Sequence, residues 1–411
     1  MDSSRSWRRN LFAVTAASFI GFTGFTLVMP FLPLYFRELG VTDVGEIALW
    51  TGFSLGVTPA MTAVLAPLWG RMADRFGRKI MVERSLASFV VVMAAMAWAT
   101  EAWHVLALRV FQGFFAGYGA LALTMAADSA PPGGMAAAIG TVQTAQRLGP
   151  ALGPVIGGAV AGVVGLRRAF LVAAAFYAAG FVLVLISYAE RRTALEASRD
   201  GRVAAPAPTW RHILRIETFG LLMGAMFLLQ FVDRSLGPIL PLFLSDLGVP
   251  LPRVPLVSGV LFSVAAGAGA LGNTLCARLL KRISVRAVLC AAAAVAAAAA
   301  LVLAARPRLE LVSLAIAAFG AAVGTAMTTA YTAGGNALPA AVRGTGFGLL
   351  TSASLTGLAL SPIVAGLLGA LDIRVVFVVD ALAMGALAIV ASRRMPGRTL
   401  EVRRPPGGPW E

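Results

Sequence analysis

A few charged side chains stand inside long apolar stretches of this chain, where a charge is costly and therefore usually functional. Within hydrocarbon, one ionised group costs roughly 2.5–3.5 kcal/mol or more. An arginine there can hold a nearby carboxylate ionised, or release it, and it can also bind an anion. The candidate residues for proton coupling or substrate binding are Arg109, Arg147, Asp128, Asp233 and Arg234.

All of these positions except Arg147 have a plainer alternative. Arg109 lies near one end of its stretch, so its side chain can extend to the interface. Asp233 and Arg234 are neighbours and can form a structural ion pair, and Asp128 lies at an end where a charge costs little. We expect Arg147, which lies deep in its stretch, to contact either an anionic substrate or a buried acid.

A second pattern combines two glycines, one carboxylate and four cations between two apolar stretches. We expect a tight turn here, with Asp74 at the N-terminus of a facing helix, where a negative charge is stabilised by ~0.3–1 kcal/mol. We expect the cations to pair with carboxylates across the two halves of the chain. The residues of this predicted gating loop are Gly70, Arg71, Asp74, Arg75, Gly77, Arg78 and Lys79.

Small residues recur every four positions further along the chain. Gly149, Gly153 and Gly157 would form one helix face that allows another helix to pack closely. Pro150 and Pro154 remove backbone donors and can bend that helix. Together with Gly158, such a face suits a pliable seam between two halves, although ordinary helix packing uses similar faces.

The elements that carry these residues are membrane-spanning helices. Of 411 residues, 58% are hydrophobic and 13% are charged, whereas a soluble domain carries about 25% charged residues. The fold class is therefore all-α integral membrane protein, since apolar blocks reach the roughly 20 residues that a spanning helix needs. We expect twelve helices near residues 11–36, 45–69, 80–100, 103–127, 136–163, 168–189, 216–244, 254–278, 284–304, 309–331, 344–370 and 374–392.

The two halves of the chain repeat each other. Residues 28–41 align with residues 236–249 at an offset of 208, and seven of the fourteen positions are identical. An offset that spans an even number of helices makes the repeats parallel, which places a solute site near the midplane between them. We expect six-helix bundles at 1–189 and 216–392, a cytoplasmic linker at 190–215 and a cytoplasmic tail at 393–411.

Positive charge is distributed unequally between the two sets of loops. With the N-terminus in the cytoplasm, the inner side holds 23 Lys and Arg residues and the outer loops hold seven. This bias places both termini in the cytoplasm. Because the cations follow the membrane topology, the net charge of +15 does not indicate a nucleic-acid partner.

Composition and motifs also argue against an enzyme. The two cysteines, Cys276 and Cys290, are too few for a disulfide framework or a cysteine-rich metal site, and we expect no metal and no cofactor. The two histidines, His104 and His212, fall in predicted loops, and no metalloprotease motif, nucleophile elbow or phosphate-binding loop is present. ATP-driven transport by this chain is disfavoured for the same reason.

Residues 70–79 resemble the loop signature of the major facilitator superfamily. The run Arg109-Val-Phe-Gln112-Gly113 resembles a motif of its proton-coupled drug antiporters, and residues 149–158 resemble the antiporter motif of its exporters. Residues 29–35 and 66–70 are similar to bacterial twelve-helix multidrug exporters. The resemblance covers the chain from its first to its last helix.

The resemblance implies a proton-driven exporter of amphipathic small molecules in a bacterial inner (plasma) membrane, working as a monomer by alternating access. A transporter of one metabolite, such as a sugar or an organic anion, is the alternative. Helices 1, 4, 7 and 10 would line the cavity, so that Asp233 faces Arg109, and Gln112 belongs to the same motif. Asp380 would lie on a peripheral helix and make a packing or polar contact. Candidate cavity residues are Phe19, Phe22, Phe25, Gln143, Gln146, Phe227, Gln230, Phe231 and Asn336.

The chain also departs from the family pattern. The first predicted helix contains no acidic residue, whereas several relatives carry an acid there. In the second half, Lys281 stands where the repeat of Asp74 is expected. We therefore expect that proton coupling does not use the first helix and that the two halves gate unequally.

Overall fold

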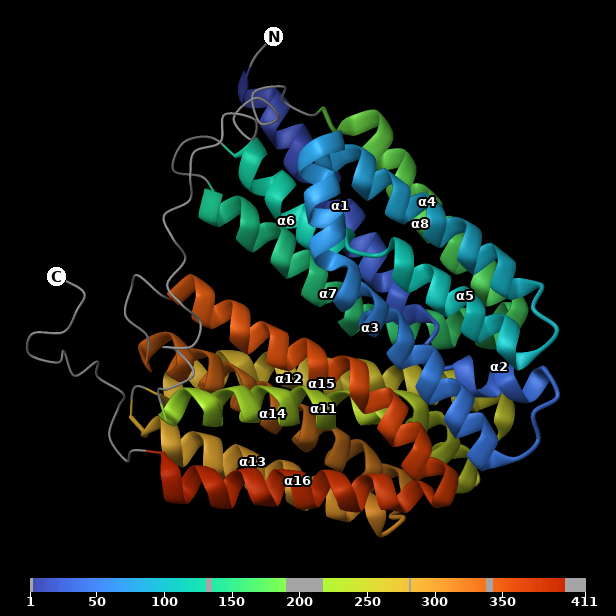
Figure 1. Cartoon of the computed structure of the whole chain (residues 1–411). Helices are drawn as coiled ribbons and strands as arrows, with labels where there is room; N and C mark the ends of the chain where they lie inside the picture. The colour runs from blue at the N-terminus through green and yellow to red at the C-terminus, as the bar shows by residue number, and fades with distance from the viewer. Residues whose placement is uncertain (1–2, 131–134, 190–216, 281, 338–342, 396–411) are drawn as a thin grey trace, which may run out of the picture. The chain divides into compact units, whose positions relative to one another are not determined.

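The computed structural model describes residues 3–130, 135–189, 217–280, 282–337 and 343–395, and within these ranges the fold is built from helices without a strand. Figure 1 shows their order along the chain. The first half contains α1 (Ser3–Leu27), α2 (Leu32–Glu38), α3 (Val44–Phe76), α4 (Arg78–Ala97), α5 (Ala102–Phe115), α6 (Tyr118–Ser129), α7 (Met135–Val164) and α8 (Leu166–Ser187). The second half contains α11 (Glu217–Asp246), η1 (Leu251–Arg253), α12 (Val254–Leu279), α13 (Val285–Ala304), α14 (Leu309–Ala337), α15 (Arg343–Leu371) and α16 (Ile373–Arg394).

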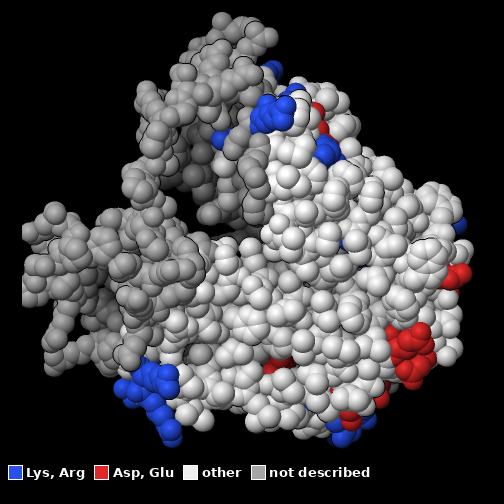
Figure 2. Space-filling view, viewed as in Figure 1, with Lys and Arg blue, Asp and Glu red and all other residues white. Residues whose placement is uncertain are grey.

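These helices confirm the predicted class of multi-pass membrane protein. Within the described residues, eleven helices are long and apolar enough to cross a membrane. The predicted fourth helix is the exception, because it is divided into α5 and α6. Many large apolar side chains face outward, Val163 at 86% exposure and Leu371 at 80% among them. On the face drawn in Figure 2, charged side chains lie mainly near the helix ends, and uncharged residues cover most of the surface between them.

Proline and glycine explain most of the differences from the predicted helix bounds. The predicted first helix is interrupted after Leu27, and Pro33 lies in the first turn of α2, where its missing N–H needs no partner. We expected a tight turn over residues 70–79. The turn is shorter than this, because α3 continues to Phe76. Only Gly77, with a φ of 100°, separates α3 from α4. Gly70 therefore lies inside a helix rather than in a turn, and this expectation was wrong.

The chain forms two compact units whose limits differ from the predicted halves. The first unit comprises Met1–Val203, Gly237–Ser263 and Pro362–Ile373, and the second comprises Ala204–Leu236, Val264–Ser361 and Arg374–Glu411. The first unit thus joins the helices of the first repeat to one end of α11, α12 and α15. The division into bundles at 1–189 and 216–392 stays a prediction.

In the first unit, α1 is the central helix. It packs against α6, α7 and α8, while α4 packs against α8 and α3 against α5. Buried aromatic rings fill the spaces between these helices: Phe31 meets Phe170 edge to face, with ring centroids 5.2 Å apart, and Phe89 meets Tyr177 in the same way at 5.2 Å. The contacts of α3 with α5 and of α1 with α7 position the backbone that carries Arg109 and the glycines of α7.

In the second unit, α12 and α14 approach closely through glycines. A Cβ atom at Gly324 would collide with the carbonyl group of Gly269, and one at Gly272 would collide with that of Ala321. Thr325 also donates a hydrogen bond to the Gly272 carbonyl oxygen at 3.2 Å. Small residues on both helices therefore allow the backbones to touch, which is how helices associate tightly within a membrane.

Candidate functional site

Arg109 and Gln112 lie one helical turn apart on α5 and are hydrogen-bonded to each other. Nη1 of Arg109 donates to Oε1 of Gln112 at 3.0 Å. Arg109 is only 1% exposed, so its side chain does not extend to the surface. Its Nε and Nη2 atoms have no hydrogen-bond partner among the described residues. A buried guanidinium with one amide acceptor is under-satisfied, which is the condition in which it attracts an anion or a carboxylate.

The backbone of α5 at this point is held against α3. Oγ1 of Thr58 donates to the carbonyl oxygen of Arg109 at 2.9 Å. Gly113 allows the close approach, because a Cβ atom there would lie 2.7 Å from both the Thr58 carbonyl oxygen and Cβ of Met61. Glycine at the end of the Arg-x-x-Gln-Gly motif is therefore needed for helix packing, whatever the role of Arg109.

Two tyrosines, one on α6 and one on α8, are buried beside α1. Tyr118 packs against Gly21 of α1 and Tyr177 packs against Gly24, each where a larger residue on α1 would collide with the ring. Neither hydroxyl group has a hydrogen-bond partner among the described residues. Tyr177 also lies within electrostatic range of Arg109. Polar groups with unused hydrogen-bonding capacity thus gather between α1, α5, α6 and α8, and the sequence analysis did not predict this cluster.

The predicted fourth helix is broken two residues after Gly113. α5 ends at Phe115 and α6 begins at Tyr118. Between them Gly117 has a φ of 121°, in the region that glycine adopts without steric cost. A break inside a membrane frees backbone carbonyl groups, which must be satisfied within the protein because lipid cannot donate hydrogen bonds.

Side chains from α3 and α4 satisfy the carbonyl groups at the end of α5. Nε1 of Trp69 donates to the Phe114 oxygen at 2.7 Å. The Phe115 oxygen accepts from Nη2 of Arg84 at 3.2 Å and from Oγ of Ser85 at 2.6 Å. Arg84 also lies over the Trp69 ring, 3.6 Å from its centroid. A cation is favoured at a helix C-terminus, so Arg84 both caps and neutralises the end of α5.

The predicted gating loop makes its described contacts within the first half. Nζ of Lys79 donates to the carbonyl oxygens of Leu185 at 3.0 Å and Tyr188 at 2.7 Å, at the end of α8. Lys79 also pairs with Glu83 of its own helix at 3.7 Å. These partners lie at the C-terminus of a helix, where carbonyl groups are free to accept, and the expectation that this cation pairs with a carboxylate across the two halves stays a prediction. Arg75 lies against the ring of Phe76, 5.3 Å from its centroid.

The glycine face of α7 packs mainly against α1. Cβ atoms at Gly149, Gly153 and Gly157 would collide with Phe22, Thr26 and Leu27, respectively. The neighbouring Gly158 instead lies against the carbonyl group of Pro255, at the start of α12 in the second repeat. Pro150 and Pro154 both lie inside α7. Contacts of this motif with the second repeat are thus made by Gly158 and by the carbonyl group of Pro154, against Gly259, rather than by the four-residue glycine face.

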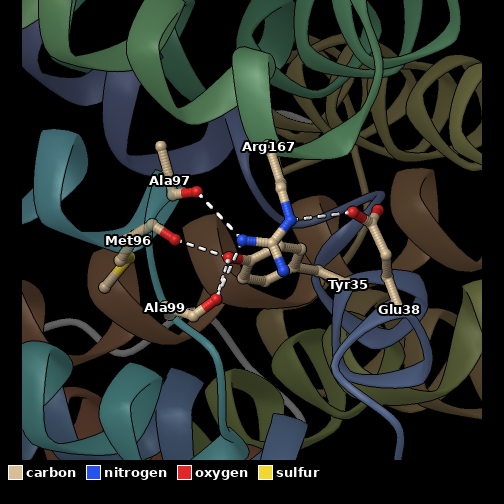
Figure 3. A network of polar contacts seen from close by, with 6 residues as sticks. All are labelled: Tyr35, Glu38, Met96, Ala97, Ala99 and Arg167. Atoms are coloured by element: carbon tan, nitrogen blue, oxygen red, sulfur yellow. Dashed lines mark hydrogen bonds and ion pairs between the residues drawn. The ribbon is translucent and has the colours of Figure 1, made fainter.

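At the same end of the helices, a polar network joins α2, α4 and α8 (Figure 3). Nε of Arg167 pairs with Oε1 of Glu38 at 3.1 Å, and its Nη1 donates to the carbonyl oxygens of Ala97 and Ala99 at 3.3 and 3.0 Å. The hydroxyl group of Tyr35 donates to the Met96 oxygen at 2.6 Å. A pocket of about 380 Å³ adjoins this network, lined by Glu38 with residues of α7, α12 and other elements of the first unit.

The candidate residues of the second unit form separate local contacts. Asp233 and Arg234 pair with each other at 3.4 Å, and both are partly exposed. Oγ of Ser354 donates to Oε1 of Gln230 at 3.3 Å. The rings of Phe227 and Phe231 lie 5.9 Å apart. The expected pairing of Asp233 with Arg109 across a cavity stays a prediction.

Asp380, which we expected to make a polar contact, makes one with Ser235 of α11. The Ser235 and Asp380 oxygens, Oγ and Oδ2, lie 2.6 Å apart, and Asp380 is 1% exposed. Its other carboxyl oxygen has no hydrogen-bond partner among the described residues. An acid so deeply buried in a membrane helix is as unusual as Arg109.

The remaining predicted residues make a described contact, are exposed, or have side chains that the structure does not describe. Nε2 of Gln146 donates to the Gly119 oxygen at 2.9 Å, and the Phe22 ring lies 5.6 Å from that of Tyr118. Gln143 is exposed. In the described part of the chain no group of His, Cys, Asp and Glu is placed to hold a metal ion. The burial of Gly70 and the side chains of Arg71, Asp74, Asp128, Arg147 and Asn336 lie outside the description.

Apolar spanning helices, glycine contacts between two sequence repeats and isolated buried charges define a multi-pass membrane protein of the secondary-transporter class. A family model described as Major Facilitator Superfamily matches residues 14–354 and 222–409. The chain belongs to this superfamily. The match confirms the resemblance drawn from the sequence motifs.

Curated relatives and solved structures agree with this assignment. The chain is 31% identical over 264 residues to multidrug resistance protein MdtG of Proteus mirabilis, a match that spans 64% of each chain. It is 31% identical over 275 residues to the multi-drug resistance efflux pump PmrA homolog of Lactococcus lactis, covering 67% of each. In structure it is similar to a bacterial homolog of the human lysosomal transporter Spinster, with a TM-score of 0.73, 19% identity and coverage of 96% and 98%. A D-xylose-proton symporter gives a TM-score of 0.72 at 14% identity, covering 95% and 98%.

Proposed function

We propose that this chain is a secondary active transporter that exports amphipathic, drug-like molecules in exchange for protons, by alternating access. The observation that carries the proposal is the identity of about 30% to proteins named as multidrug resistance proteins. Its own residues support the proposal: Arg109 is buried with unused donors, and the repeats meet through glycine. The transporter would lie in a bacterial inner membrane with both termini in the cytoplasm, bind lipid around its apolar surface and work as a monomer.

The energetics of proton exchange are sufficient for export. One proton that moves through 100 mV releases about 2.3 kcal/mol. Each 1.4 kcal/mol corresponds to a tenfold concentration ratio, so one proton supports a gradient of about 40-fold for a neutral solute. No further energy source, and in particular no nucleotide, is needed.

The test is transport into proteoliposomes that contain the purified full-length chain. An imposed pH gradient should drive accumulation of a fluorescent amphipathic cation such as ethidium, and a protonophore should abolish it. Protein-free liposomes under the same gradient serve as the control for passive partitioning. Absence of gradient-driven accumulation for every compound in a panel of amphipathic cations and neutral molecules overturns the proposal.

The alternative is transport of a single metabolite, and the residue that favours it is Arg147, which suits an organic anion. Counterflow with anionic and cationic solutes separates the two functions. An anion transporter should lose exchange in Arg147→Ala. An exporter of amphipathic cations should keep it.

A further inference from the structure

Asp380 is the one charged residue of α16 between Arg374 and Arg393, so its carboxyl group lies about a third of the way along a membrane-spanning helix. The side chain faces the protein, with 1% of its surface exposed. An uncompensated charge at such a position costs several kcal/mol, and a carboxyl group there takes up a proton instead of remaining ionised.

The hydrogen bonds of Ser235 indicate where that proton lies. Its Oγ is 2.9 Å from the carbonyl oxygen of Val232 and 2.6 Å from Oδ2 of Asp380. A serine hydroxyl has one hydrogen to donate, and a carbonyl oxygen can only accept. When the serine hydrogen is donated to Val232, the hydrogen in the 2.6 Å contact must come from the carboxyl group of Asp380. Both contacts are satisfied at once only if Asp380 is protonated.

The charged and titratable groups on neighbouring helices do not compensate a carboxylate at this site. On α11, Asp233 and Arg234 pair with each other at 3.4 Å. On α13, Cys290 donates to the carbonyl oxygen of Ala388, about two turns further along α16. Among the described residues, the hydrogen-bond partner of the Asp380 carboxyl group is Ser235.

A purely structural role for this acid is costly. One carboxyl oxygen has no hydrogen-bond partner among the described residues. A buried polar atom without a partner costs about 1–3 kcal/mol, which an apolar side chain of similar size avoids. An ionisable group inside a membrane-spanning segment instead marks a functional site, such as a step in proton transfer.

We propose that the carboxyl group of Asp380 is the proton-binding site of the second repeat, with Ser235 as its hydrogen-bond partner. This inference rests on the proposed proton antiport and names the acid that carries the proton. In the packed state the carboxyl O–H bond is intact and donates to Ser235. Release transfers the proton to water and leaves a carboxylate, which requires hydration. Proton release is therefore tied to the opening of the packing between α11 and α16, and proton uptake to its closure.

The decisive comparison uses Asp380→Asn, which keeps the size and polarity of the protonated acid but has no proton to release. In proteoliposomes this variant should retain substrate counterflow within about twofold and lose pH-gradient-driven accumulation by at least tenfold. Asp372→Asn, at an exposed position between α15 and α16, is the matched control and should keep both activities. Gradient-driven accumulation by Asp380→Asn at the wild-type level overturns the inference.

A second measurement does not depend on transport. The infrared carbonyl band of a protonated carboxyl group should be present in the wild-type protein at neutral pH, shift on deuteration and be absent from Asp380→Asn. Ser235→Ala should shift the band, because it removes the hydrogen-bond acceptor of the carboxyl group. This variant still tests the inference if Asp380→Asn does not fold. An unchanged band in either variant overturns the inference. If the wild-type protein carries the band but shows no gradient-driven transport, the proposed function fails while the protonated state of Asp380 stands.

Discussion

Gly259 of α12 lies directly against the carbonyl group of Pro154 in α7, with no room for a Cβ atom. Gly52 of α3 has the same relationship to the carbonyl group of Pro362 in α15. Pro154 and Pro362 are related by the repeat offset of 208, and Gly52 and Gly259 by 207. Two of the contacts between the sequence repeats are therefore equivalent glycine–carbonyl pairs, and both lie within the first unit.

A side chain at Gly259 should prevent this end of the repeats from closing. Gly259→Val should reduce transport by at least tenfold, because backbone carbonyl groups cannot move aside cheaply. Gly267→Val, on the same helix but with open space around it, is the matched control and should be tolerated. The measurement is uptake in proteoliposomes at equal amounts of inserted protein.

The same pair of variants can be compared by thiol labelling. A cysteine introduced at Leu34, which lines the pocket at this end, should be labelled faster in Gly259→Val than in Gly267→Val, with both native cysteines replaced. Equal labelling rates in the two backgrounds contradict a closing role for the Gly259–Pro154 contact.

Arg109 should be more important for transport than for stability. Arg109→Met removes a buried and under-satisfied charge while preserving much of the volume, so the unfolding temperature should stay equal or rise. Transport should fall by at least 100-fold, because no cation remains to act on an acid or an anion. Arg109→Lys keeps the charge but not the planar hydrogen-bond donors of the guanidinium group, and it should retain partial activity. An inactive protein whose unfolding temperature falls steeply would instead assign Arg109 a structural role.

The cap on α5 should stabilise the broken helix. Trp69→Phe keeps the ring stacking with Arg84 but removes the N–H donor to Phe114, which should cost about 1–3 kcal/mol of unfolding free energy. Ser85→Ala should cost less, because Arg84 also donates to the Phe115 oxygen. Denaturant titration in detergent gives both values. The reverse order of the two effects contradicts this description of the cap.

The network of Figure 3 should depend more on Arg167 than on its ion pair. Glu38→Gln removes a half-exposed pair and should cost at most about 1 kcal/mol. Arg167→Gln should cost more, since it also removes the bonds to the carbonyl oxygens of Ala97 and Ala99. High salt should reduce the stabilisation that the Glu38 ion pair provides. It should change much less the stabilisation from the hydrogen bonds of Arg167 to the carbonyl oxygens. Comparable losses for the two variants would show that the ion pair dominates.

Hydropathy predicted the helices well because length and apolarity are what a bilayer requires. α12 begins at Val254, where the sequence placed it, and ends one residue later than expected, at Leu279. The break at Gly117 was missed for a physical reason. Glycine is common in continuous membrane helices, so a glycine in an apolar run does not by itself indicate a break, and the capping groups Trp69 and Arg84 come from distant positions in the sequence.

The candidate site was predictable only in part. The motif resemblance grouped Arg109 with Gln112, but the sequence could not show that Arg109 lacks a carboxylate partner among the described residues. Spacing also predicted a close-packed face on α7, but not that its partner is α1. Asp380 was assigned to a peripheral contact, because its burial against Ser235 depends on packing between α11 and α16, far apart in the chain.

The most direct test of the central claim is proton release from the purified protein on substrate binding. In weakly buffered detergent solution, addition of an exported amphipathic compound should release protons from the wild-type chain, approaching one per molecule, and the release should be absent in Asp380→Asn. Binding of such a compound without any proton release from the wild-type protein would contradict proton antiport.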